Sequence, residues 1–306
     1  MTEILSGKQT SAAIKSWVTD SVTEIKNKYG WTPSLATVRI GENEAAECYI
    51  RSQLKACEKA GIDGKLITFP EDIEKEEFLK EVKKIADDPE IDGIIIETPL
   101  PKGWRTEEVL SVIPPIKDVE GIHPENLGRL YLGEKGIPMP CTAAASVALL
   151  EWYGYTNFTH KNCVVLGRSA TVGRAVTLML MHRNGTVTMC HTKTSDEHKR
   201  GLLAEADFVV VAAGMPGVVS TADLKPGAIV IDVATNVTEE GKLVGDLVFD
   251  PEHEIAAVSP VPGGVGPVTV AVLLSNLLLC ATRRRLKETM LLPGLEAVRE
   301  SYGFSK

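Results

Sequence analysis

One stretch of the sequence places two polar side chains where they could hold a ligand. Residues 46–62, AECYIRSQLKACEKAGI, put Tyr49 and Gln53 four positions apart, which is one face of a helix. A phenol and an amide can orient a bound molecule through hydrogen bonds, but an amide does not titrate near neutral pH. The pair therefore predicts positioning by Gln53, and excludes Gln53 as a general acid or base.

A glycine turn is the second chemical feature. Residues 167–173, GRSATVG, follow a strand-like run and precede a helical one. Glycines in such a turn let the backbone approach a pyrophosphate, and the N–H groups that begin the helix face the anion. The middle glycine of G-x-G-x-x-G is missing, so a simple tight turn is the alternative interpretation.

The strand after this turn bears on the choice of nucleotide. It ends in CHTKT, with no acid before Asp196, whereas NAD-specific domains usually place an acid there to bind the ribose 2′-OH. Arg168, Thr192 and Lys193 could instead surround a 2′-phosphate. The pattern favours NADP, with NAD as the alternative, and a solvated loop lysine is the other interpretation of Lys193.

The elements that must position these residues alternate along the chain. Before residue 141, strand-like runs at 34–41, 64–69 and 92–100 alternate with helical runs, which indicates βαβ units and a parallel sheet. A second α/β pattern follows, with four strand-like runs around the glycine turn, at 161–167, 185–190, 206–214 and 227–235. We therefore predict an α/β protein of two domains, the second one Rossmann-like.

Composition narrows the function classes. The 306 residues are 44% hydrophobic and 24% charged, which is globular, and the net charge of −8 disfavours nucleic acid as a partner. The six cysteines form no CxxC pair, so neither a disulfide framework nor a zinc cluster is expected. We see no signal peptide, and the uncharged run 258–282 has fewer helix-compatible apolar residues than the roughly 20 of a bilayer span. We expect a cytoplasmic protein without a membrane anchor.

Four stretches together resemble one family, the methylenetetrahydrofolate dehydrogenase/methenyltetrahydrofolate cyclohydrolases. They are the Tyr49 helix, IETPLP at 96–101, KDVEGIHPENLGRL at 117–130 and PVPGGVGPVTVAVLL at 260–274. The glycine turn and CHTKT also match the cofactor segments of that family. The resemblance implies tetrahydrofolate derivatives as substrates and NAD(P) as the cofactor.

The resemblance also implies an architecture. A folate-binding catalytic domain at 1–140 would be closed by a C-terminal helix at 268–306, and a Rossmann domain would span 141–267. The active site would lie in the cleft between the domains, and a homodimer would form through the cofactor domain.

Site residues follow from the same resemblance. The catalytic candidates are Tyr49, Gln53 and Glu97. The candidates for substrate binding are Tyr49, Glu97, Asp118, Glu120, Pro262, Gly263 and Gly264. The candidates for cofactor binding are Gly167, Arg168, Ser169, Val172, Gly173, Thr192, Lys193, Gly266 and Thr269. His123 beside Asp118 and Glu120 suggests a loop network, and no metal is expected.

The chain departs from the family pattern around the folate site. The family has Ser-x-x-Tyr-x-x-x-Lys on the first helix, where this chain has Ala46, Tyr49 and Gln53. Lys55 does not replace the missing lysine, because two positions along a helix is about 200° of rotation. Three other motifs differ, giving Glu97-Thr98-Pro99-Leu100, Asp118-Val119-Glu120-Gly121 and Pro140-Cys141-Thr142-Ala143.

These departures predict which reaction survives. Opening the methenyl ring with water needs a group that titrates near working pH, as a lysine with a lowered pKa does. Hydride transfer to a nicotinamide needs positioning and charge stabilisation, and an ionised Glu97 would stabilise the cationic methenyl product. We therefore predict a monofunctional, NADP-preferring dehydrogenase. The alternatives are a bifunctional enzyme that uses Glu97 for proton transfer, and a folate- or nucleotide-binding protein without catalysis.

Overall fold

The chain folds into two compact units, each with its own parallel sheet. The computed structural model describes residues 1–42, 44–238 and 240–303, apart from the side chains of residues 44–46 and 48. The three-stranded unit comprises residues 14–139 and 270–293, and the six-stranded unit comprises residues 1–13, 140–269 and 294–306.

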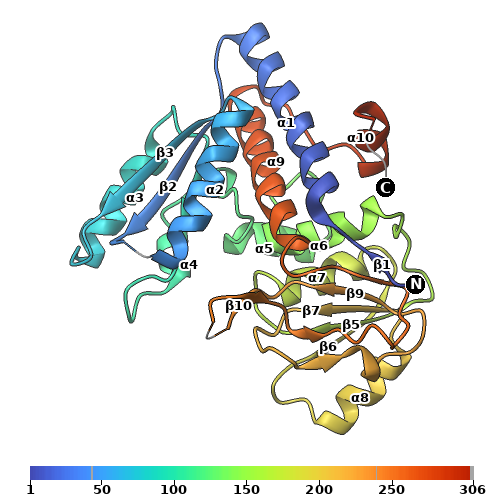
Figure 1. Cartoon of the computed structure of the whole chain (residues 1–306). Coiled ribbons are helices and arrows are strands. Elements are labelled where there is room, and N and C mark those ends of the chain that lie inside the picture. Colours follow the sequence, from blue (N-terminus) through green and yellow to red (C-terminus); the bar gives the residue numbers. More distant parts are fainter. Residues whose placement is uncertain (43, 239, 304–306) are drawn as a thin grey trace. The chain divides into compact units, whose positions relative to one another are not determined.

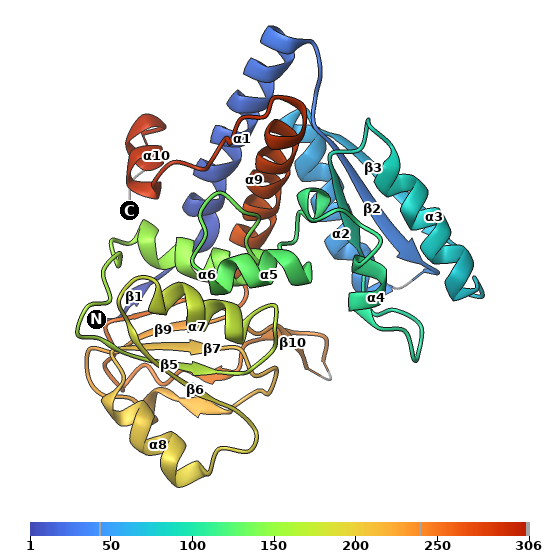
Figure 2. The ribbon, with the colours of Figure 1, turned by 180° about the vertical axis from the view of Figure 1, so that it is seen from behind.

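The three-stranded unit is built on a sheet in the order β3-β2-β4, with all pairs parallel. Its strands are β2 (Ser34–Ile40), β3 (Asp63–Phe69) and β4 (Gly93–Ile96). Its helices are α2 (Glu44–Ala60), α3 (Lys75–Asp87), α4 (Thr106–Leu110), η1 (Pro115–Lys117) and α5 (Pro124–Tyr131). Most of two long helices, α1 (Gly7–Tyr29) and α9 (Val265–Arg285), completes it, and they lie side by side in both views (Figures 1 and 2).

The two faces of this sheet are covered differently. Val38 of β2 and Ile96 of β4 pack into a buried cluster with Phe78 of α3. On β4, a Cβ added at Gly93 would lie 2.3 Å from Val119 and 2.7 Å from Leu277 of α9. Alternate residues of a strand point to opposite faces. The residues of β2 and β4 that alternate with the cluster residues therefore point to the face away from α3.

The carboxyl end of α9 is fixed to the same sheet by charge. Asp92, fully buried just before β4, accepts a 2.8 Å hydrogen bond from Arg285 Nε and also pairs with Arg284. Its other oxygen accepts from the Ser34 backbone N–H at 3.1 Å. A buried carboxylate is stable when it is paired and hydrogen-bonded in this way.

The six-stranded unit has a parallel sheet in the order β1-β13-β9-β7-β5-β6. Its strands are β1 (Glu3–Ile4), β5 (Asn162–Leu166), β6 (Thr186–Cys190), β7 (Phe208–Val211), β9 (Ile229–Asp232) and β13 (Ala257–Val258). Four short strands lie outside this sheet: β8 (Val219–Ser220), β10 (Asn236–Val237), β11 (Leu243–Val244) and β12 (Leu247–Val248). Its helices are α6 (Cys141–Trp152), α7 (Gly173–Met181), α8 (Asp196–Glu205), η2 (Thr221–Asp223) and α10 (Leu295–Ser301).

Right-handed crossovers place helices on both faces of this sheet. β5 lies between β6 and β7, so the crossovers through α7 and α8 run in opposite directions along the sheet. Leu203 of α8 packs with Val164 and Leu166 of β5, and alternation turns Val165 to the other face. Figure 1 shows α7 and α8 on different sides of the strands. The predicted α/β class, with two parallel sheets and a Rossmann-like second half, is confirmed.

The compact units differ from the predicted domain boundaries at the chain ends. β1 pairs with β13, with Glu3 opposite Ala257, so residues 1–13 belong with the six-stranded unit. Arg299 of α10 donates to the Trp152 carbonyl of α6 at 3.0 Å, which places residues 294–303 there too. The functional division at 1–140, 141–267 and 268–306 stays a prediction.

One helix of the described residues, α9, is long and apolar enough to cross a membrane by length and composition alone. The protein itself buries 83% of the most apolar window of α9. This is the pattern of a core helix, and Gly93 shows how closely that helix packs on β4.

Candidate active site

Helix α2 presents Tyr49 and Gln53 differently. Ile50 and Cys57 are fully buried and hold α2 on the sheet, and this burial raises the pKa of the Cys57 thiol to about 12. Gln53 is fully buried beside them, whereas Tyr49 is 38% exposed. Lys55 is exposed, as its rotation from Gln53 along the helix predicts. No lysine of α2 therefore takes the buried place of Gln53.

The structure brings Gln53 and Glu97 together from segments far apart in sequence. Glu97 directly follows β4, and its Oε1 accepts a 3.3 Å hydrogen bond from Gln53 Nε2. Burial raises the pKa of the Glu97 carboxyl, while the Gln53 hydrogen bond and the Arg39 charge oppose the rise. Gln53 Oε1 is buried and accepts no hydrogen bond from the described residues. A buried acceptor left open in this way suits a donor on a bound molecule.

Asp118 and Glu120 lie in the loop after η1. Asp118, 2% exposed, accepts 2.8 Å hydrogen bonds on Oδ2 from the His123 N–H and from Asn126 Nδ2. Burial of its carboxyl raises the pKa of Glu120 to about 8, and the charges of Asp118 and Glu97 add to the rise. Glu120, Asp118 and Glu97 therefore form one acidic group on the three-stranded unit.

His123 has a structural place in this loop. Its Nδ1 accepts from the Glu125 N–H at 3.1 Å and caps α5. Within the described ranges, no group of three His, Cys, Asp or Glu side chains is placed to hold a metal ion. The expectation that no metal takes part stays a prediction.

The PVPGGVGP loop belongs to the six-stranded unit and is tightly packed there. The Val261–Pro262 peptide is cis, and Gly263 has φ of +104°. A Cβ at Gly264 would lie 2.6 Å from the Pro260 oxygen, and one at Gly7 would lie 1.9 Å from the Gly264 oxygen. The Gly7 N–H donates to the Gly263 oxygen at 2.8 Å. This backbone shape therefore depends on glycine, and substrate binding by Pro262, Gly263 and Gly264 stays a prediction.

The glycine turn between β5 and α7 is equally constrained. Gly167 has φ of +121°, and a Cβ there would lie 2.1 Å from the Ala212 oxygen. A Cβ at Gly173 would lie 2.2 Å from the Gly167 oxygen. Ser169 Oγ accepts from the Val172 and Gly173 N–H groups at 3.2 and 3.3 Å. The turn is thus fixed in shape at the start of a helix, with the Val172 and Gly173 N–H groups bonded to Ser169.

A cavity of about 430 Å³ opens beside this turn, at the carboxyl ends of β5, β6 and β7. Four predicted cofactor residues line it, namely Gly167, Arg168, Ser169 and Thr192. Lys193 does not, because its side chain is exposed and its N–H donates to His191 Nδ1. Gly266 and Thr269 also lie outside the lining, in the first turns of α9, where the Thr269 hydroxyl donates to the Val265 oxygen.

Two charged residues of this cavity, Lys199 and Asp196, had no assignment from the sequence. Lys199 lines it, is 19% exposed and pairs with Asp196 Oδ1 at 3.1 Å, and Asp196 lines it as well. The signal in the sequence was the i, i+3 spacing of this pair in the first turn of α8. Either charge can meet the substituents of a ribose at this edge of the sheet.

Asp246 supports the same cavity from behind. It is fully buried, and its Oδ2 accepts 2.8 Å hydrogen bonds from the Ala213 and Gly214 N–H groups. Asn236 Nδ2 donates to its other oxygen at 2.9 Å. Ala213 lines the cavity, so the buried carboxylate fixes one of its walls.

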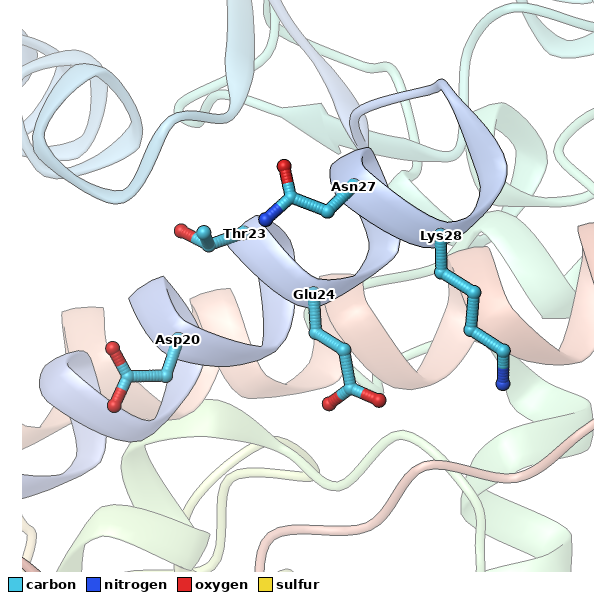
Figure 3. Close-up of a pocket in the computed structure, with 5 residues that line it drawn as sticks. All are labelled: Asp20, Thr23, Glu24, Asn27 and Lys28. Atoms are coloured by element: carbon cyan, nitrogen blue, oxygen red, sulfur yellow. The ribbon is translucent and has the colours of Figure 1, made fainter.

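A second surface depression lies on α1 and involves none of the predicted site residues (Figure 3). It is lined by Asp20, Thr23, Glu24, Asn27 and Lys28. All five side chains come from one exposed stretch of a single helix (Figure 3). We assign no chemistry to it.

Comparison with known proteins gives the family. Residues 5–120 match the model of the tetrahydrofolate dehydrogenase/cyclohydrolase catalytic domain, and residues 140–285 match the model of its NAD(P)-binding domain. The bifunctional protein FolD of Staphylococcus haemolyticus is 39% identical over 284 residues, which cover 92% of this chain and 98% of that protein.

Solved structures agree with this match. The crystal structure of the bifunctional enzyme FolD, methylenetetrahydrofolate dehydrogenase/cyclohydrolase, from Campylobacter jejuni has a TM-score of 0.88 at 36% identity and covers 93% of this chain and 100% of its own. The methylenetetrahydrofolate dehydrogenase-cyclohydrolase of Trypanosoma brucei, complexed with NADP cofactor and inhibitor, has a TM-score of 0.87 at 33% identity and covers 94% of this chain and 99% of its own. The chain therefore belongs to the tetrahydrofolate dehydrogenase/cyclohydrolase family.

Proposed function

We propose that this protein oxidises methylenetetrahydrofolate to methenyltetrahydrofolate with NADP and does not hydrolyse the product. The observation that carries the proposal is the fully buried Gln53, hydrogen-bonded to Glu97. The resemblance places a lysine at this position in the family. A buried amide cannot transfer the protons that ring opening requires.

Hydride transfer asks for something different from the same side chains. Methylenetetrahydrofolate gives its hydride directly to the nicotinamide, so the protein must align two rings and stabilise charge. The family's Lys and Gln are replaced by Gln53 and Glu97, which makes this site more negative. A carboxylate near the delocalised cation of the product lowers the barrier to its formation.

The proposal assigns roles to the remaining candidates. Tyr49 orients the substrate from its half-exposed position, and Asp118 and Glu120 bind the pterin. Because Glu120 is one methylene longer than the family's aspartate, its carboxylate reaches further to bind the pterin. Pro262, Gly263 and Gly264 contribute backbone to the substrate site.

NADP is the proposed cofactor because of the charges at the cavity. Arg168 and Lys199 line it, and the segment after β6, His191 to Thr194, carries no acid. The Trypanosoma brucei relative is complexed with NADP. Asp196 is the one acid of the lining, and it would favour a ribose 2′-OH, so NAD is the second cofactor.

A second candidate function is the bifunctional one. The Staphylococcus haemolyticus relative is named bifunctional, and burial raises the pKa of the Glu97 carboxyl toward the range where a group can exchange protons. In this candidate Glu97 would replace the lysine as the proton-transfer group. A homodimer through the six-stranded unit and a cytoplasmic location accompany both candidates as predictions.

One assay separates the candidates. Purified protein is mixed with methylenetetrahydrofolate and NADP or NAD. The reduced nicotinamide is followed by its fluorescence, and the methenyl product by its absorbance after an acid quench that destroys the reduced nicotinamide. We expect equal amounts of both to accumulate, with methenyltetrahydrofolate then decaying at the buffer rate. The Campylobacter jejuni enzyme, a methylenetetrahydrofolate dehydrogenase/cyclohydrolase by name, serves as a control in which less methenyl product should accumulate. Enzyme-dependent loss of methenyl absorbance would favour the bifunctional candidate, and absence of reduced nicotinamide would leave only ligand binding.

A further inference from the structure

Arg39 and Glu97 are neighbours on one face of the three-stranded sheet. β2 and β4 are parallel with Val38 opposite Ile96, and the Glu97 N–H donates to the Val38 oxygen at 2.8 Å. Arg39 and Glu97 are the next residues of the two segments, about 5 Å apart at the backbone. Because Val38 and Ile96 point into the cluster with α3, alternation turns Arg39 and Glu97 to the opposite face.

The guanidinium of Arg39 is fixed on that face. Its Nε donates to Thr68 Oγ1 of β3 at 3.0 Å, and its Nη1 donates to Glu47 Oε2 of α2 at 2.5 Å. The side chain is only 13% exposed. A partly buried arginine held by two partners keeps its charge in place at little further cost in side-chain entropy.

The groups around Glu97 make this charge important. Gln53 of α2 donates a neutral hydrogen bond to Glu97, and Glu120, with Asp118 beside it, faces Glu97 from the loop after η1. Arg39 is the cation that acts on Glu97 among the described residues. With an amide at position 53, α2 supplies no positive charge to a carboxylate that is half-buried and close to other acids.

We propose that Arg39 is a positioning residue for the dehydrogenase reaction, which keeps Glu97 ionised so that its charge meets the cationic product. This inference rests on the role proposed for Glu97. Burial favours the protonated form of Glu97, and the Gln53 hydrogen bond and the Arg39 charge favour the carboxylate. Arg39 therefore supplies the charge compensation that the pair Gln53 and Glu97 lacks.

The test is the pH dependence of dehydrogenation in the full-length protein. If Glu97 must be ionised, kcat falls at low pH as Glu97 takes up a proton, and this fall is the acid limb. Loss of Arg39 raises the pKa of Glu97. Arg39→Gln should therefore move the acid limb of kcat upward by roughly one pH unit, with the rate recovering at high pH. Arg39→Lys, which keeps the charge in another geometry, should give an intermediate shift.

Arg51→Gln is the matched control. Arg51 pairs with the same Glu47, at 3.4 Å, but is 74% exposed and does not act on Glu97. Its acid limb should match that of the unchanged protein. In a Glu97→Gln background the acid limb should be lost, and Arg39→Gln should then shift nothing.

Three outcomes would overturn the inference. In the first, Arg39→Gln lowers the rate equally at every pH. In the second, Glu97→Gln removes the acid limb but Arg39→Gln leaves it in place, and in the third, Arg39→Gln still shifts the limb in the Glu97→Gln background. The pKa of Glu97 can also be measured without activity, by ¹³C NMR titration of its carboxyl, whose signal is assigned by its absence from the spectrum of Glu97→Gln. This pKa must rise in Arg39→Gln and in Arg39→Lys. If Glu97→Gln itself leaves the rate and the limb unchanged, the proposed role of Glu97 fails instead.

Discussion

The glycine turn and the Gln53–Glu97 pair constrain the sequence in different ways. At Gly167 and Gly173 any side chain would collide with backbone oxygens at 2.1 and 2.2 Å, so the shape of the turn decides the residue. Gln53 and Glu97 lie on a helix face and after a strand, where the backbone accepts many residues. In the proposed function, cofactor binding therefore depends on backbone geometry, whereas the reaction depends on side chains that can be exchanged. Residues of the second region can therefore change without a change of fold.

The largest expected effect breaks the first region. Gly167→Ala puts a Cβ against the Ala212 oxygen at a positive φ, which we expect to cost about 3 kcal/mol or to move the turn. The KM for NADP should rise on the order of 100-fold, measured by steady-state dehydrogenation, with a smaller change in the KM for folate.

Gly201→Ala is the control for that variant. Gly201 lies in α8 of the same unit, and no atom stands within 4 Å of an added Cβ. Alanine favours a helix by about 1 kcal/mol over glycine, so thermal stability should rise slightly and the cofactor KM should not change. A cofactor KM that is unchanged in Gly167→Ala as well would contradict a nucleotide site at this turn.

The sequence predicted what is encoded locally. The strands, the glycine turn and the position of Gln53 on a helix face follow from spacing of a few residues, and the five cysteines Cys57, Cys141, Cys163, Cys190 and Cys280 are buried. Arg39, Lys199 and Asp246 were not predicted, because their partners depend on tertiary contacts. Asp246 reaches Ala213 across 33 positions of sequence, and nothing local marks it as the support of a cavity wall.

A middle-sized effect tests whether the cavity prefers NADP. Arg168→Ala and Lys199→Ala remove cations from the lining, and each should weaken NADP far more than NAD, by ~1 to 3 kcal/mol, through lost charge-assisted bonds to the 2′-phosphate. Lys193→Ala is the comparison variant, because Lys193 is exposed and outside the lining. Competition binding with both nucleotides measures the ratio. A larger loss in Lys193→Ala than in Lys199→Ala would return the phosphate contact to Lys193.

The smallest expected effect concerns the exchangeable region. Gln53→Lys restores the residue of the family pattern, yet we expect methenyl hydrolysis to stay close to the buffer rate. The new ammonium would lie in hydrogen-bond reach of Glu97, where Gln53 Nε2 now lies 3.3 Å from Oε1. Burial lowers the pKa of such a lysine, but an adjacent carboxylate raises it and keeps both groups ionised as a pair. An ammonium held in an ion pair does not exchange protons near neutral pH.

Replacing the carboxylate as well should release that lysine. In Gln53→Lys with Glu97→Gln, burial acts without the opposing charge, so the pKa of the lysine falls toward the working range and methenyl hydrolysis should rise about tenfold or more above the single variant. Ser52→Lys is the control, since residue 52 is exposed on the same helix and a lysine there meets solvent. Stopped-flow loss of methenyl absorbance measures all three. Hydrolysis in the single variant as fast as in the double variant would show that Glu97 does not restrain a lysine at position 53.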